Sequence, residues 1–221
     1  RRPAKRVEPR RPERRSVEVA AAAPARAERK HTGRSLIEVK NEATSLYRSK
    51  NFSGAAVALN SSLSGFGSED AKDLKSLAGI YSQLGKAYSI GMAPGTKPIE
   101  AYQALIRAIP YDGEVGGAYT QEMEHRLADT APRAATSYMA ARSYELALQA
   151  VRKAESLGSK SENIRIVRGM LDDTARDLLR TAKGELSTDP EAAKQKLRQI
   201  QGMVEPRNPL HAQAGKLLNG P

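Results

Sequence analysis

The feature that most constrains the fold is a six-position pattern of small, aromatic and aliphatic residues that occurs twice in the chain. The copies begin at Ala43 and Ala135, and the matching positions follow after 3, 9, 12, 16 and 19 residues. The first copy continues with Leu46, Phe52, Ala55, Leu59 and Ser62, and the second with Tyr138, Tyr144, Ala147, Val151 and Ala154. Because two unrelated segments would seldom agree at six places, the pattern predicts an internal repeat.

The packing of paired helices explains which type of residue stands at each position. In the first copy, the small residue Ala43 lets two antiparallel helices approach closely, and the aromatic Phe52 caps their junction. The second small residue, Ala55, lies on the facing helix, and Leu59 packs onto the next repeat one turn later. We interpret the second copy in the same way.

Two further segments carry parts of this pattern. One has the spacing Y-x₂-L-G-x₂-Y and then small or aliphatic residues before a proline: Tyr81, Leu84, Gly85, Tyr88, Ala101, Leu105, Ala108 and Pro110. The other is more degenerate and pairs two groups of residues across 187–190: Ala175, Leu178 and Leu179 with Ala193, Leu197 and Ile200. We therefore count four repeat units, which are spaced by 40 to 50 residues.

The segment 81–88 resembles the opening of a tetratricopeptide repeat, W-x₂-L-G-x₂-Y, with Tyr in place of Trp. With the two six-position copies, residues 35–205 resemble this family, although its usual period is about 34 residues. The resemblance implies an all-α fold, a right-handed superhelix of antiparallel helix pairs known as an α-solenoid. The repeat-packing residues are then Ala43, Leu46, Phe52, Ala55, Tyr81, Leu84, Gly85, Tyr88, Ala135, Tyr138, Tyr144 and Ala147.

From Ser35 onward, apolar residues follow the helical period and turn signals divide the chain into helix-sized pieces. The clearest breaks are Gly65–Phe66–Gly67, Pro94–Gly95, Pro110–Tyr111–Asp112–Gly113, Gly158–Ser159 and Asp189–Pro190. We expect one helical-repeat domain over residues 34–221, with about four helix pairs and a terminal capping helix at 209–218. Scarce Phe and Trp, and the lack of alternating β-branched runs, argue against a β-sandwich or barrel.

Residues 1–33 are predicted to form a disordered basic linker. Residues 1–32 hold eleven Lys and Arg against four Glu, and so carry seven of the chain's eleven net positive charges. Four prolines and very few large apolar side chains leave too little burial to offset the entropy of ordering. The segment is either a solvated linker or a polybasic contact for an anionic membrane surface or nucleic acid. Specific base recognition is disfavoured because aromatic residues are not interleaved there.

The residue types that carry enzyme chemistry form no recognisable site. The chain has no Cys, which excludes disulfides and thiolate chemistry. Its histidines, His31, His125 and His211, are far apart, and Glu122-x-x-His125 lacks the second such pair that a di-iron bundle requires. The acidic pairs at 69–70 and 172–173 fit solvated helix positions. We expect no catalytic residue, no metal site, no cofactor and no small-molecule substrate.

A protein or peptide partner is the expected ligand. In the family that the chain resembles, the first helix of each pair lines a concave groove, and polar residues there contact the partner. By this resemblance the partner-binding residues are Lys40, Asn41, Tyr47, Gln83, Lys86, Arg133 and Ser137.

These observations predict a non-enzymatic interaction or scaffold module, the C-terminal part of a larger bacterial signalling protein. The alternative is a structural component of a cell-envelope or secretion assembly, with the basic segment as a spacer. No apolar stretch approaches the roughly 20 residues of a membrane span. We expect a cytoplasmic protein; a membrane tether in a part preceding Arg1 and a periplasmic location stay open alternatives.

The repeat alignment predicts which face of residues 144–156 is buried. Ala147→Arg should destabilise the fold by on the order of a few kcal/mol, because it places a charged, bulky side chain where two helices nearly touch. Gln149→Arg, two residues away on the solvent side, should be almost neutral. Thermal melts of the two variants test this, and equal stability would show the alignment to be wrong.

Overall fold

The computed structural model describes residues 33–220, and within them it is all-helical, as the sequence predicts. Residues 1–32 and Pro221 lie outside the described part, so the predicted disorder of the N-terminal segment stays a prediction. Residues 33–220 form nine α-helices and one short 3₁₀ turn, Leu63–Gly65, which lies between the second and the third helix. The helices are α1 (Leu36–Arg48), α2 (Phe52–Ser62), α3 (Ser68–Met92), α4 (Pro98–Glu114), α5 (Thr120–Ala140), α6 (Tyr144–Ser156), α7 (Glu162–Glu185), α8 (Pro190–Met203) and α9 (Pro209–Asn219).

Local signals start most of these helices. Ser35 caps α1 through a capping box, in which Glu38 N donates to the Ser35 hydroxyl at 3.2 Å and Ser35 N donates to the Glu38 carboxylate at 2.7 Å. Asn51 and Asp189 cap α2 and α8 through their side-chain oxygens. Three helices, α4, α8 and α9, begin with a proline, whose missing N–H costs nothing at that position.

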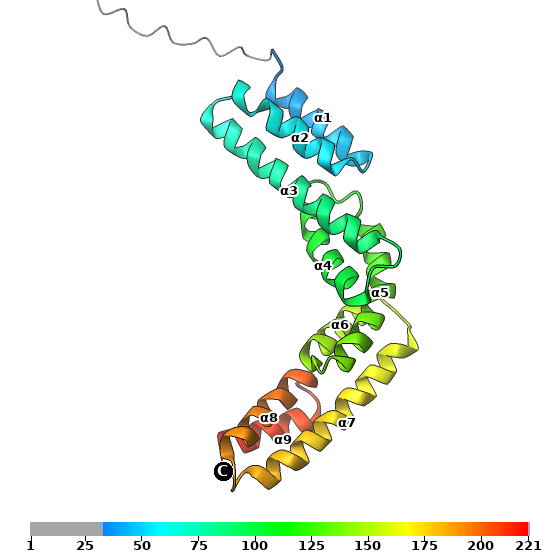
Figure 1. Ribbon diagram of the computed structural model, residues 1–221, viewed down its shortest axis with the longest axis vertical. Coiled ribbons are helices and arrows are strands. Elements are labelled where there is room, and N and C mark those ends of the chain that lie inside the picture. The colour runs from blue at the N-terminus through cyan, green and yellow to red at the C-terminus, as the bar shows by residue number, and fades with distance from the viewer. Residues whose placement is uncertain (1–32, 221) are drawn as a thin grey trace, which may run out of the picture. The chain divides into compact units, whose positions relative to one another are not determined.

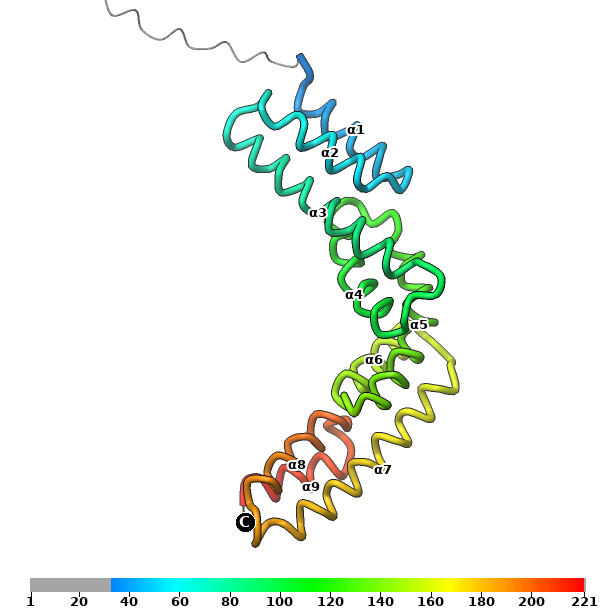
Figure 2. Tube along the Cα trace, viewed as in Figure 1, coloured from blue at the N-terminus to red at the C-terminus, as the bar shows by residue number. Residues whose placement is uncertain are grey.

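Each helix packs against the next one along the chain (Figure 1), from α1 on α2 to α8 on α9. Contacts also join helices two apart, α3 with α5, α5 with α7 and α6 with α8. The trace therefore passes through the domain in chain order, without a distant return (Figure 2). The arrangement is helical and repeat-like; the right-handed superhelix expected from the sequence stays a prediction.

The core runs between the helices, and small residues allow the closest approaches. Ala43, Ala135 and Ala147 are completely buried. Gly85 in α3 faces the start of α2, where an added Cβ would lie 2.8 Å from the Cβ of Phe52. That distance is too short for any side chain, so only glycine permits this contact.

The predicted break at Pro110–Tyr111–Asp112–Gly113 is wrong, because α4 continues through these residues to Glu114. Pro110 removes one backbone hydrogen bond near the end of the helix. Asp112, two residues later, is fully buried and accepts three hydrogen bonds that hold the end of the helix in place. The chain leaves the helix only after this anchor, at 115–119.

Asp112 is the centre of a polar network that joins α1, α4 and α5. Its carboxylate accepts from the hydroxyl of Tyr47 at 2.6 Å, from the backbone N–H of Tyr119 at 3.0 Å and from the hydroxyl of Thr120 at 2.7 Å. The Tyr47 hydroxyl in turn accepts from Ala118 N at 2.7 Å. Burial, followed by the bond to Asp112, raises the pKa of Tyr47 well above its usual value.

The network predicts a large cost for removing the buried carboxylate. Asp112→Ala should lower the free energy of unfolding by on the order of 3 kcal/mol, because it leaves three donors without an acceptor. Glu114→Ala, on the same helix but exposed, is the matched control and should change stability by less than about 0.5 kcal/mol. Urea denaturation of both variants measures the difference, and similar losses would contradict an anchoring role for Asp112.

Candidate interaction surface

The residues predicted to contact a partner lie on the first helices of their pairs, α1, α3 and α5. Asn41, Gln83, Lys86 and Arg133 are exposed there, whereas Lys40 and Ser137 are half-buried. Tyr47 is buried in the network around Asp112, so the prediction that it contacts a partner is wrong. Tyr47 lies one helical turn after Ala43 and two turns after Val39, and both of these are core residues. This spacing places Tyr47 on the buried face of α1 and could have corrected the prediction.

One hollow on the surface lies between α4, α5 and α6. It has a volume of about 360 Å³ and is lined by Tyr102, Gln103, Ile106, Arg107, Tyr138, Leu146 and Gln149. The rings of Tyr102 and Tyr138 meet edge to face at 6.2 Å, and the Gln103 amide donates to the Tyr138 hydroxyl at 3.0 Å. Burial raises the pKa of Tyr102. Ile106 and Leu146 keep 36% and 41% of their surface exposed.

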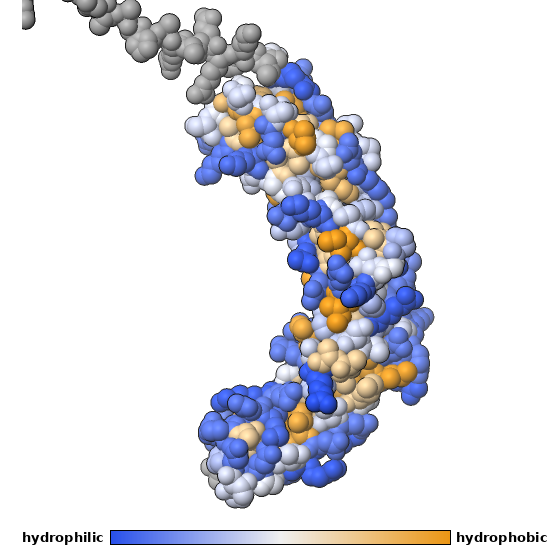
Figure 3. Space-filling model, in the orientation of Figure 1, coloured by the Kyte–Doolittle hydropathy of each residue, from blue (hydrophilic) through white to orange (hydrophobic). Residues whose placement is uncertain are grey.

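The second hollow adjoins the first and lies between the start of α6 and α8. Its volume is about 340 Å³, and its lining residues are Arg142, Ser143, Tyr144, Glu145, Leu146, Arg198, Gln199 and Gly202. Leu146 lines both hollows, which therefore adjoin at this side chain. Apolar patches show over α4 and α6 between hydrophilic areas (Figure 3). We call these two hollows together the α4–α6–α8 surface.

This surface is built mainly from the second helices of the pairs, whereas the family resemblance predicts a groove lined by the first helices. Of the residues predicted for a partner, none lines either hollow. One signal in the sequence could have indicated this surface: an apolar residue that lies outside the buried face of its own helix. In α6 the buried residues are Ala147, Leu148, Ala150, Val151 and Ala154, and Leu146 falls beside that stripe. An exposed leucine at such a position indicates a surface that is partly apolar.

Three arginines face the surface without a carboxylate partner. Within residues 33–220, Arg107, Arg142 and Arg198 form no ion pair. Arg107 instead donates from Nε to the backbone oxygen of Gln103 at 3.1 Å. The one acid in the lining, Glu145, accepts from the Gln149 amide at 3.3 Å. With three arginines against one glutamate, the lining carries a net positive charge. Glu191 offsets this charge in part, because the charge of Arg198 contributes to lowering the pKa of Glu191.

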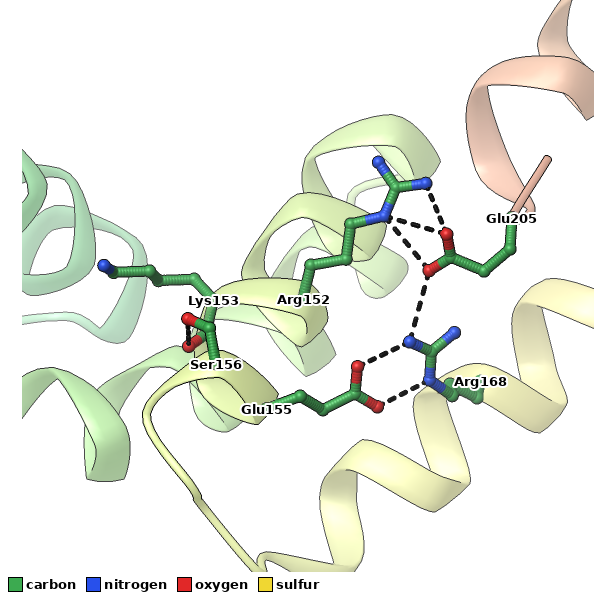
Figure 4. Close-up of polar contacts among 6 residues, drawn as sticks. All are labelled: Arg152, Lys153, Glu155, Ser156, Arg168 and Glu205. Atoms are coloured by element: carbon green, nitrogen blue, oxygen red, sulfur yellow. Dashed lines mark hydrogen bonds and ion pairs between the residues drawn. The ribbon is translucent and has the colours of Figure 1, made fainter. Parts of the chain in front are cut away.

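Elsewhere in the domain, two other arginines differ from these three because they are ion-paired with glutamates. Arg152 of α6 and Arg168 of α7 both bond Glu205, which follows α8, and Arg168 also bonds Glu155 (Figure 4). The pKa of the Glu205 carboxyl is lowered chiefly by its hydrogen bonds from Arg152. These four residues neutralise one another and hold α6, α7 and the connection to α9 together, and so their role is structural.

Arg142 has a backbone conformation that L-residues rarely adopt. Its φ of 55° lies in the left-handed region, as does the φ of 61° at Lys50, the corresponding turn residue of the first pair. Both turns close in the same way: Asn51 N bonds Leu46 O at 2.9 Å, and Ser143 N bonds Tyr138 O at 2.9 Å. At the end of α6 the left-handed position is occupied by a glycine, Gly158, whose φ is 72°.

Side-chain contacts compensate the strain at Lys50. Its ammonium forms an ion pair with Glu122 at 2.7 Å and lies 5.4 Å and 5.1 Å from the ring centres of Tyr88 and Tyr119. The bond from Lys50 lowers the pKa of Glu122. In the described part of the chain, the Arg142 side chain has no ion pair or aromatic ring of this kind. Arg142 is therefore strained without local compensation.

The residues considered for chemistry are not assembled into a centre. Among residues 33–220, no group of three or more His, Asp and Glu side chains could hold a metal ion. Glu122 bonds Lys50 and the hydroxyl of Tyr88. Glu69 and Asp70 lie in the first turn of α3, and Asp172 accepts from the Asn208 amide at 2.8 Å. No helix in this part combines the length and apolarity that a membrane span requires.

Comparisons with known proteins give no relative for the chain. No model of a protein family matches it, and neither a curated protein nor a solved structure does so.

The conformation of Arg142 predicts that glycine would be more stable at this position. Arg142→Gly should raise the free energy of unfolding by about 0.5–1 kcal/mol, because glycine adopts positive φ without a steric penalty. Arg142→Ala removes the same charge but keeps the strain, and so should give no such gain. Urea denaturation compares the two variants, and equal stabilities would show that the residue is not strained.

Proposed function

We propose that this chain is a non-enzymatic, tetratricopeptide-like module that binds a segment of a partner protein on the α4–α6–α8 surface. The observation that carries the proposal is the junction of the two hollows at Leu146. Partly exposed apolar side chains there are surrounded by tyrosines, amides and guanidinium groups. Tyrosine and arginine around an apolar centre are the residue types that contribute most to protein-protein binding energy.

The size of the surface suits a segment rather than a small molecule or a whole domain. Each hollow is near the lower end of the volumes that hold a drug-sized ligand, and both are open to solvent. Because they adjoin, a chain of several residues can place successive side chains in the two hollows. The helices that form the walls give such a segment a firm support.

A differential capture experiment tests this function. The full chain carrying Ile106→Asp and Leu146→Asp should lose a protein that the unchanged chain recovers from a lysate of its native cell. The reason is that the two carboxylates disrupt the apolar centre of the surface. The control is Ile166→Asp on α7, since Ile166 is 48% exposed but lies outside both hollows. Quantitative mass spectrometry should show at least tenfold depletion for the double variant alone.

Two further arms give this experiment its specificity. In the first, the eleven Lys and Arg of residues 1–32 are replaced by Gln in the full chain, and recovery of the same protein should persist. In the second, circular dichroism establishes that the double variant keeps its helical content. A folded double variant that recovers the same proteins as the control would contradict the proposal.

A further inference from the structure

We infer that the occupant of the α4–α6–α8 surface is an acidic segment of a partner protein, with an apolar side chain between carboxylates. This inference rests on the function proposed above and specifies the chemistry of the partner. The observations that carry it are the charges of the lining residues, their order along the surface and the conformation of Arg142.

The charges select an acidic ligand. Arg107 lines the first hollow, Arg142 and Arg198 line the second, and none of them has an ion-pair partner in residues 33–220. Glu145 is the only acid among these lining residues, and it lies in the first turn of α6, where the helix dipole favours a negative charge. A carboxylate can accept two parallel N–H bonds from each guanidinium group, which is the geometry that arginine recognises best.

The order of the residues specifies the pattern in the ligand. Leu146 belongs to both hollows, whereas Arg107 belongs to the first and Arg198 to the second. An apolar side chain bound over Leu146 and Ile106 therefore has a guanidinium group toward each end. The complementary segment has acidic residues on both sides of an apolar one.

The strain at Arg142 supports a role for its side chain. Glycine would adopt the same turn at lower cost, as it does at Gly158. Non-glycine residues in the left-handed region are enriched at ligand-binding positions, where the strain is part of how the site works. At Lys50 the equivalent side chain has internal partners, so the same argument does not apply there.

Two other occupants of the surface, the chain's own basic segment 1–32 and a nucleic acid, are disfavoured. Residues 1–32 carry eleven basic and four acidic side chains, and the three arginines would repel them. Nucleic acid is disfavoured because Tyr102 and Tyr138 face each other edge to face, and Tyr138 also receives the bond from Gln103. These rings present no stacking platform for bases.

A display library of random 12-residue peptides, selected on the full chain, tests the inference. The selected peptides should be net acidic, with Asp or Glu on both sides of an apolar residue. Synthetic copies, measured by fluorescence anisotropy, should bind at least about tenfold more weakly to a variant with Arg107→Glu and Arg198→Glu. The matched control is Arg48→Glu with Arg207→Glu, two exposed arginines that line neither hollow.

A second selection on the Arg107→Glu and Arg198→Glu variant should yield basic peptides, which a merely unfolded protein would not do. Selected peptides that are neutral or basic, and that depend on Leu146 but not on the arginines, would overturn this inference and leave the proposed function standing. Peptides that ignore the Leu146→Asp change would overturn both. Tighter binding of a 20-nucleotide single-stranded DNA, lost on arginine reversal, would overturn the acidic peptide as the ligand.

Discussion

The buried carboxylate of Asp112 is the interaction on which the N-terminal half of the domain depends. Neighbouring helices in such an array hold one another through local contacts, but Asp112 links α4 and the start of α5 to Tyr47 in α1. Tyr119 completes the link, because its hydroxyl donates to the backbone oxygens of Tyr47 and Arg48. These bonds engage backbone oxygens at the end of α1, where the regular series of helical N–H donors runs out.

An aromatic cluster surrounds this polar centre. Tyr47, Phe52, Tyr81, Tyr88 and Tyr119 have neighbouring ring centres 5.1–6.1 Å apart, mostly tilted or edge to face. Lys50 lies over two of these rings and closes the cluster toward solvent. One apolar core runs from α1 to α9, and the ion pairs around Glu205 additionally join α6, α7 and the segment after α8.

Much of the fold was predictable because its signals are local. Capping residues, N-terminal prolines and glycines mark the helix boundaries within a few residues, and the six-position pattern identifies buried small residues such as Ala43 and Ala147. The continuation of α4 past Pro110 was not predictable in this way. The continuation depends on the hydrogen bond between Asp112 and Tyr47, which is remote in sequence. From the sequence alone, an aspartate shortly after a proline favours a turn.

The α4–α6–α8 surface was harder to predict because it depends on how successive helix pairs are placed. Residue type and period show which side chains leave the core, but not which exposed faces of different helices adjoin. Leu146 and Ile106 stand out only when α4 and α6 are seen to line one hollow. Arg107 and Arg198 are far apart in sequence, and only the folded structure shows that they line adjoining hollows.

The sharing of Leu146 between two hollows has a mechanical consequence. The walls of these hollows belong to three successive helix pairs, so a small pivot of one pair against the next changes the width of a hollow. A ligand that fills both hollows selects one set of pivot angles and resists the others. Occupancy of the surface would stiffen the middle of the array, and tension that opens the array would release the ligand.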